Sequence, residues 1–128
     1  MPPARITVVI EELPPSANRL WRFVPGRRPM KSLEYRGWLS RTGLYVRTLV
    51  KEKYDLPPKK PWGLFIIAEG LTRRRDLDNI IKPICDMLSY SGIVPDDRWL
   101  DFIDVRATRR SGNPRLELQI YDQDRLPR

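Results

Sequence analysis

The amino-acid sequence predicts one domain of the mixed α+β or α/β class, with elements in the order β-α-β-α-β-β and a mixed four-stranded sheet on which two helices pack. Three observations lead to this fold. The chain has 128 residues, which is enough for one hydrophobic core but not for two. Four short segments are β-branched, continuously apolar or alternating, as strands are. Two longer segments repeat apolar residues at the helical spacing of three and four.

The first strand and the first helix are predicted on either side of a loop. Residues 6–11 are rich in β-branched side chains and are soon followed by two prolines, which end a strand. Residues 14–31 contain several prolines and a glycine and predict a loop. Ser32 is a suitable N-cap, so a helix is expected over residues 32–54, before further prolines. Its apolar stripe is predicted to contain Tyr35, Trp38, Leu39, Tyr45, Val46 and Leu49.

The second helix is predicted between two apolar strands. Residues 62–71 contain an uninterrupted apolar run, which indicates a buried strand at the centre of the sheet. Apolar residues then recur at helical spacing from Leu77 to Leu88 and stop before Gly92, a suitable C-cap. Pro83 lies inside this segment, so we expect an irregular first turn or a start later than Asp78.

The last two strands are predicted over residues 100–109 and 115–121, joined by a turn at residues 111–114. The final strand alternates cleanly between apolar and polar positions, as a half-buried strand requires. Its inward residues are expected to be Leu116, Leu118 and Ile120.

The composition favours a polyanionic partner. Lys and Arg number 24 against 16 Asp and Glu, which leaves a net charge of +8 and a sequence pI near 10.1, as in nucleic-acid-binding domains. The alternative is a basic protein that is merely soluble. Histidine is absent, which removes the usual general base and the commonest zinc ligand. The single cysteine, Cys85, excludes an internal disulfide and is expected to be a small buried hydrophobe.

The sequence also indicates a cytoplasmic protein that is neither exported nor embedded in a membrane. Residues 1–5 contain no apolar signal core, and no run approaches the roughly 18 apolar residues of a membrane span. A lone cysteine fits a reducing compartment. No small-molecule cofactor is expected.

The loop over residues 14–31 is a candidate nucleic-acid contact. Its basic residues alternate with Trp21 and Phe23, and arginine binds phosphate while aromatic rings stack on exposed bases. In the alternative interpretation, the loop is simply basic and its two aromatic residues dock on the core. The basic residues concerned are Arg19, Arg22, Arg27, Arg28 and Lys31.

The segment from Arg73 to Asn79 is the first candidate for chemistry, because three arginines precede Asp76 and Asp78. If this segment is extended, residues two apart share a face and the two carboxylates can reach one point. Mg²⁺ prefers oxygen ligands and takes one or two carboxylates while it keeps water and phosphate oxygens. Alternatively, either aspartate could cap the following helix and complement its dipole.

A second acidic pair and a lysine complete the candidate site. Asp96 and Asp97 follow the end of the predicted helix, and they approach the first pair only if the next strand lies beside the strand over residues 62–71. Lys82 lies four residues after Asp78, on the same helical face. It can hold a phosphate or polarise water, or it can form an ordinary surface ion pair with Asp78.

The two acidic pairs and the lysine lie in a segment that resembles a known family motif. The run RRRDLDNIIKPICDMLSYSGIVPDD resembles the signature of the RusA family, homodimeric endonucleases that resolve Holliday junctions by paired, metal-dependent cuts. PPSANR at residues 14–19 and RLEL at residues 115–118 are similar to its first element and last strand. The resemblance implies that Asp76, Asp78 and Asp97 bind the metal, that Lys82 is the catalytic lysine, that Arg75 contacts DNA and that Asn79 shapes the site.

The carboxylates and the lysine predict an Mg²⁺-dependent, or Mn²⁺-dependent, nuclease, and the resemblance implies that it cuts four-way DNA junctions as a homodimer. The basic run Arg73, Arg74 and Arg75 would offset the repulsion between DNA and three carboxylates, so binding should weaken steeply with salt. Three alternatives remain: a nonenzymatic DNA- or RNA-binding module, a nuclease of flaps, forks or single strands, and a basic assembly protein without affinity for junctions.

Overall fold

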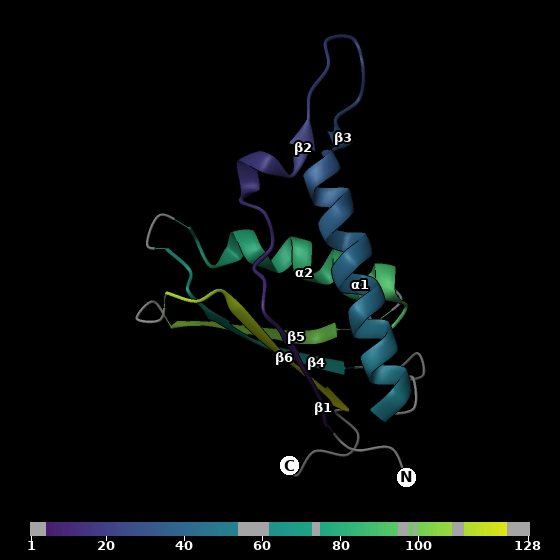
Figure 1. Ribbon diagram of the computed structural model, residues 1–128, viewed down its shortest axis with the longest axis vertical. Coiled ribbons are helices and arrows are strands. Elements are labelled where there is room, and N and C mark those ends of the chain that lie inside the picture. The colour runs from purple at the N-terminus through teal and green to yellow at the C-terminus, as the bar shows by residue number, and fades with distance from the viewer. Residues whose placement is uncertain are drawn as a thin grey trace.

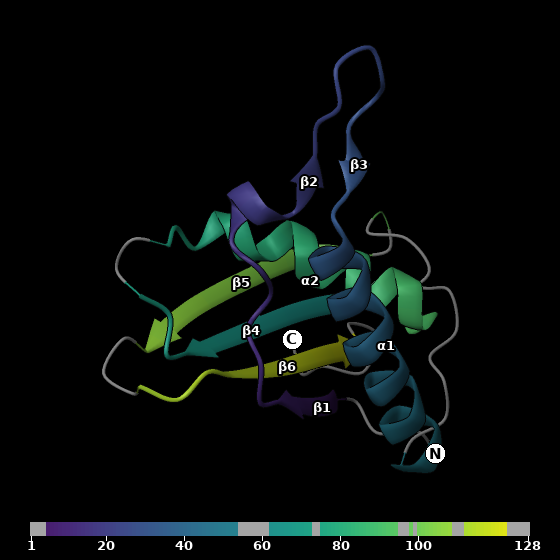
Figure 2. The same cartoon turned by 45° about the horizontal axis from the view of Figure 1, so that its top comes forward.

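The centre of the fold is a four-stranded mixed sheet (Figure 1; Figure 2). Its strands are β1 (Arg5–Ile10), β4 (Trp62–Glu69), β5 (Leu100–Thr108) and β6 (Arg115–Asp122), in the order β1-β6-β4-β5. β6 pairs antiparallel with both β1 and β4, whereas β4 and β5 are parallel. The predicted mixed sheet, with the strand over residues 62–71 in its interior, is confirmed.

The computed structural model describes residues 5–53, 62–72, 75–94, 98, 100–108 and 112–122, apart from the side chains of Ala17, Lys53 and Asp122. Two helices, α1 (Leu33–Lys53) and α2 (Asp78–Ser91), cover the same face of the sheet (Figure 1). Residues 14–31 were expected to be a loop, and most of them have no regular structure, but the prediction missed three short elements. These are a short 3₁₀ helix, η1 (Ala17–Arg19), and a hairpin of two-residue strands, β2 (Trp21–Arg22) and β3 (Met30–Lys31).

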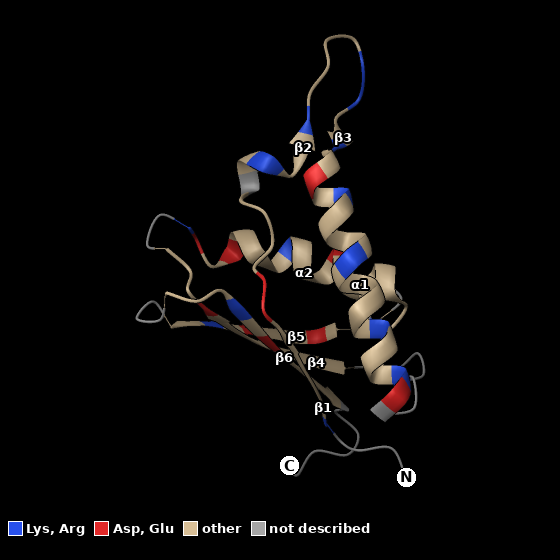
Figure 3. Cartoon of the chain, viewed as in Figure 1, with Lys and Arg blue, Asp and Glu red and all other residues tan. Residues whose placement is uncertain are grey.

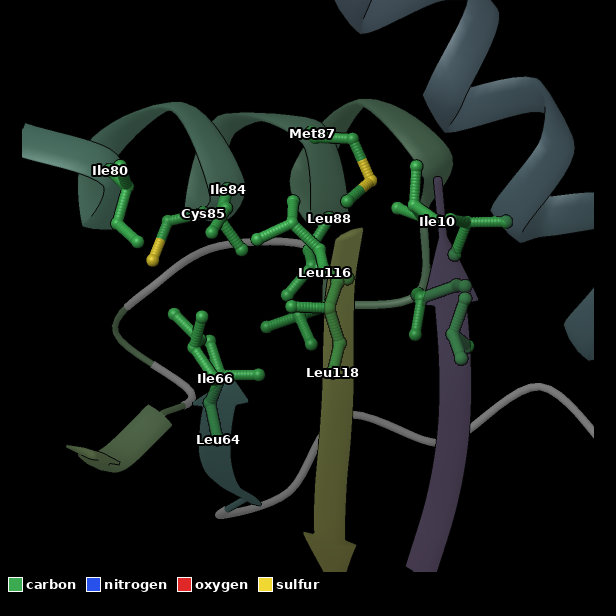
Figure 4. Close-up of a cluster of buried hydrophobic side chains, with 14 of the residues drawn as sticks. Ile10, Leu64, Ile66, Ile80, Ile84, Cys85, Met87, Leu88, Leu116 and Leu118 are labelled. Atoms are coloured by element: carbon green, nitrogen blue, oxygen red, sulfur yellow. The ribbon is translucent and has the colours of Figure 1, made fainter. Parts of the chain in front are cut away.

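The core lies between α2 and the helix-facing side of the sheet. Every second residue of β6 from Leu116 to Ile120 is fully buried, which confirms the predicted alternation. Ile80, Ile84 and Leu88 of α2 point down onto these strands (Figure 4). Cys85 is also buried, as predicted for a small hydrophobe.

The start of α1 and the end of α2 are each set by a predicted capping residue. The main-chain N–H of Tyr35 donates to Ser32 Oγ at 3.0 Å, so Ser32 caps α1 as predicted. Gly92 ends α2 in the left-handed region, at φ 79°, and its N–H donates to the carbonyls of Leu88 and Ser89. The helix is continuous from Asp78 across Pro83, so it does not start later than Asp78. Its first turn is irregular, as the other half of that expectation stated, because the N–H groups of Asn79 and Ile80 donate to the carbonyls three residues before them, at 3.2 and 3.3 Å.

The buried stripe of α1 differs from the prediction at three positions, because Tyr45 is exposed whereas Thr42 and Val50, which were not predicted, are buried. Tyr45 is 51% exposed, whereas Thr42 is only 2% exposed. A polar residue can occupy this buried position because the Thr42 hydroxyl donates to the carbonyl of Trp38 and leaves no unsatisfied group. Tyr45 therefore belongs to the exposed side of the helix.

No helix in the described part of the chain is long and apolar enough to cross a membrane.

Candidate active site

The start of α2 lies at the end of the sheet where β4 and β5 both terminate. Glu69 and Thr108, the last residues of these parallel strands, are paired in register. Gly70 turns the chain out of β4 at φ 75°, and its N–H donates to the Thr108 carbonyl at 3.3 Å. In sheets with parallel strands, ligands bind beyond the carboxyl ends of the strands, so this is the favoured place for a site.

Asp76 and Asp78 are both exposed at this end of the fold. The N-cap of α2 is Leu77, with helical dihedral angles, and no side chain caps the helix. Neither aspartate caps the helix, but Asp78 lies in its first turn, where a carboxylate complements the helix dipole as the alternative expected. The expectation of an extended segment was wrong, because Leu77 is already helical and the Asp76 carbonyl accepts from Asn79 N–H at 3.2 Å.

The two carboxylates are available for a cation. Within the described residues, neither Asp76 nor Asp78 forms a side-chain hydrogen bond or an ion pair. Exposed carboxylate oxygens of this kind are the ligands that Mg²⁺ takes when it keeps several waters. The donor set therefore fits such an ion, although the described residues contain no cluster of three acidic, histidine or cysteine side chains.

Lys82 is held by a neighbour that the sequence interpretation missed. Its ammonium lies 2.9 Å from Asp86 Oδ1, in an i,i+4 pair, rather than beside Asp78. The other carboxylate oxygen of Asp86 accepts a hydrogen bond from the hydroxyl of Tyr35. Asp86 is thus fixed from both sides. Its spacing from Lys82 was visible in the sequence, but Tyr35 precedes it by 51 residues and gave no signal.

Tyr35 joins α1 to this part of α2. Its side chain is completely buried, and burial, together with the hydrogen bond to Asp86, raises the pKa of the phenol. A buried hydroxyl needs a partner, and the Asp86 carboxylate provides it. The packing of the two helices therefore determines where the Lys82 ammonium lies.

The basic hairpin, defined as residues 21–31, carries most of the predicted DNA-contacting loop. Figure 3 shows basic positions and no acidic one along it. Arg22, Arg27, Arg28 and Lys31 are all exposed, whereas Arg19, just before the hairpin, pairs with Glu34 at 3.1 Å. The interpretation that both aromatic residues dock on the core holds only in part. Trp21 packs edge-on against Tyr35, but Phe23 is 73% exposed.

Arg73, Arg74, Asp96 and Asp97 lie outside the described residues. The second acidic pair was expected to approach the first only if the strand after it lies beside the strand over residues 62–71, and β5 does lie beside β4. The parallel direction adds a constraint. Leu100 begins β5 opposite Trp62, at the other end of the sheet from Glu69, and the 14 residues of α2 rise about 20 Å between these ends (Figure 2).

Residues 14–121 match the protein family described as Endodeoxyribonuclease RusA. The chain belongs to the RusA family. It is also 34% identical, over 102 residues, to the crossover junction endodeoxyribonuclease RusA of Enterobacteria phage HK97, a match that covers 75% of this chain and 76% of the phage protein. Membership confirms the predicted family and the predicted activity class, an endonuclease that hydrolyses DNA phosphodiester bonds and resolves crossover junctions.

The RusA match begins at Pro14, and the structure links this first element to the acidic segment. Arg75 Nη2 donates to the carbonyls of Pro14 and Pro15, at 2.9 and 3.2 Å. The guanidinium is partly buried, and burial lowers its pKa. Arg75 therefore fixes the chain directly before Asp76. Asn79, the other motif residue predicted near the cut, is exposed on the first turn of α2.

Proposed function

We propose that this chain resolves four-way DNA junctions with an Mg²⁺-dependent site built on the start of α2. The observation that carries the proposal is that Asp76 and Asp78 are exposed and have no side-chain partner among the described residues. Lys82, one helical turn after Asp78, is held by Asp86, which in turn accepts from Tyr35. Family membership supports the reaction class. A nonenzymatic binding module would have no use for this arrangement.

Asp76 and Asp78 would hold Mg²⁺, or Mn²⁺ in its place. When bound, the ion supplies positive charge at the scissile phosphate and makes water more acidic. The Lys82 ammonium, one helical turn beyond Asp78, would donate to a phosphate oxygen and stabilise the charge that develops as the phosphorus–oxygen bond breaks. Arg75 would keep the acidic segment in place through its bonds to Pro14 and Pro15.

Asp97 is proposed as the third carboxylate, and the topology favours its delivery by a second copy of the chain. Asp97 precedes Leu100 by three residues, which span at most about 11 Å. Leu100 begins at the far end of the sheet, about 20 Å along α2 from Asp78. A homodimer in which each copy completes the other's site would bring the three carboxylates together and would supply the two sites that paired cuts require.

The contacts with DNA are proposed along two basic surfaces. One is the segment that leads into the acidic pair, and the other is the basic hairpin with its preceding arginine. The phosphate contacts would be Arg73, Arg74, Arg75, Asn79, Arg19, Arg22, Arg27, Arg28 and Lys31. Such contacts release counterions, so junction affinity should fall steeply as salt rises. The cytoplasmic location inferred from the single cysteine remains a prediction.

The test is cleavage of labelled four-way junctions, flaps, forks and single strands, with and without Mg²⁺. The wild type should make paired, symmetric nicks in the junction only when Mg²⁺ is present. Asp76→Asn and Asp78→Asn should bind the junction without cutting it. Asp104→Asn is the matched control, because Asp104 is an exposed aspartate on β5, outside the proposed site. Cleavage by Asp76→Asn at the wild-type rate would refute the proposal, and faster cleavage of flaps or forks would refute the junction preference.

A further inference from the structure

The basic hairpin projects from the body of the protein, and its base is firmly attached. Both views show it extending beyond the helices and the sheet (Figure 1; Figure 2). At its base, the N–H of Ser32 donates to the Leu20 carbonyl at 2.8 Å and the Ser32 hydroxyl donates to the Arg19 carbonyl at 2.6 Å. The Trp21 ring lies 6.4 Å from the buried ring of Tyr35, measured between centroids. The base of the hairpin is therefore anchored to the body of the protein, and its tip projects from it.

The charge on the hairpin is of one sign. Its 11 residues contain four cations, Arg22, Arg27, Arg28 and Lys31, and no acidic residue. The three arginines form no ion pair within the described part of the chain, while Lys31 lies over the Trp21 ring, 5.7 Å from its centroid. Unneutralised cations on a projecting element complement a polyanion, and DNA is the polyanion on which this family acts.

Phe23 is the feature that charge alone does not explain. It follows β2 directly and remains 73% exposed, although Trp21, two residues earlier, packs against the core. A single exposed apolar residue needs no explanation by itself. Here, however, the aromatic ring is held among unpaired arginines, and this combination of stacking surface and phosphate ligands is how proteins bind unpaired bases.

We infer that the hairpin enters the open centre of a four-way junction and that Phe23 stacks on a base at the branch point while the arginines contact the surrounding phosphates. This inference rests on the proposed function and adds a specificity-determining residue to it. A continuous duplex keeps its base faces covered by stacking, whereas the strands of a junction exchange partners and can expose them at lower cost. Phe23 would therefore favour junctions over linear duplex.

The test is fluorescence of 2-aminopurine placed at the branch point of a junction, measured without Mg²⁺ so that no cleavage occurs. Wild-type protein should change the fluorescence on binding, and Phe23→Trp should preserve the change. Phe23→Ala should abolish it and reduce the preference for junction over linear duplex about 5- to 150-fold, the range expected for loss of one base–aromatic stack. Leu33→Ala is the matched control, because Leu33 is also 73% exposed but lies outside the hairpin.

A second pair of variants separates stacking from charge. Arg27→Ala combined with Arg28→Ala should flatten the salt dependence of binding by about two phosphate contacts while the fluorescence change at saturation persists. Phe23→Ala should leave the salt dependence unchanged.

Two results would overturn the inference alone: Phe23→Ala behaving like Leu33→Ala while the wild type still cuts junctions, or Phe23→Ala dissociating a dimer in light scattering, which would make the hairpin an arm between copies. A wild type that neither binds nor cuts junctions would overturn the proposed function as well.

Discussion

Replacing Tyr35 by phenylalanine tests the hydrogen bond from this buried side chain to Asp86, the residue that holds Lys82. The change removes the hydroxyl that donates to Asp86 but keeps the ring that packs against Trp21. At neutral pH the variant should lose about 1.5–3 kcal/mol of unfolding free energy, the usual contribution of a hydrogen bond to a charged group.

The difference should change with pH in a defined direction. Burial raises the pKa of the Tyr35 phenol above that of an unfolded tyrosine, which is about 10. The unfolded wild type therefore releases this proton first, so the tyrosine's contribution is complete below pH 10 and declines by about 1.4 kcal/mol per pH unit above it. Phenylalanine has no such proton. The deficit of Tyr35→Phe should shrink above pH 10 and disappear by about pH 11–12.

The assay is urea unfolding of wild type, Tyr35→Phe and Tyr45→Phe at intervals from pH 7.5 to 11.5. Tyr45 lies on the same helix but is 51% exposed, so its variant reports what loss of any hydroxyl from α1 does. A Tyr35→Phe deficit that stays constant across the whole range would refute the claim that folding raises the pKa of this phenol.

Three further predictions follow from named contacts. Asp86→Asn should slow junction cleavage roughly 10- to 100-fold with less than about a twofold change in junction affinity, because Lys82 loses the Asp86 carboxylate but the phosphate contacts remain; an equal loss in affinity and rate would contradict this. Gly70→Ala should lower the free energy of unfolding by about 1–3 kcal/mol, measured by denaturation, because φ is 75° and an added Cβ would lie 2.6 Å from the Asn113 carbonyl oxygen. Arg75→Ala should destabilise the fold by about 1–3 kcal/mol, because the carbonyls of Pro14 and Pro15 lose their donor. If Arg75 also contacts DNA, as the family motif implies, the salt slope of junction binding should fall by about one, and an unchanged slope would leave it a purely positioning residue.

Local periodicity explains what could be predicted about the fold. The alternation of Leu116 and Leu118 with polar residues marks a half-buried strand, and Gly92 marks a helix end, because each signal depends only on near neighbours. The parallel direction of β4 and β5 can also be predicted from the sequence, since strands joined through a helix are normally parallel. That direction places Leu100, the first residue of β5, at the opposite end of the sheet from Glu69, the last residue of β4.

Long-range contacts explain what could not be predicted. Whether Tyr45 or Thr42 is buried depends on how α1 is turned about its own axis when it packs against its neighbours. The apolar pattern alone does not determine which residues at the two edges of the stripe are buried. The two-residue strands of the basic hairpin are too short to show a period. The contacts from Tyr35 through Asp86 to Lys82 join two helices, and nothing in the sequence of either helix indicates that these residues meet. The aspartates and the lysine of the candidate site could therefore be recognised as a motif, whereas the contacts of Asp86 and Tyr35 that hold the lysine could not.

The central claim, a cleavage site shared between two copies of the chain, is tested most directly by mixed dimers. Asp76→Asn and Asp97→Asn chains carrying different tags would be co-expressed, and the heterodimer would be isolated and incubated with a labelled junction and Mg²⁺. Each variant alone should be inactive. The heterodimer should nick the junction, because one of its two sites receives unaltered Asp76 and unaltered Asp97 from opposite chains. A heterodimer as inactive as its parents would contradict the shared site, since that result requires all three carboxylates to come from one chain.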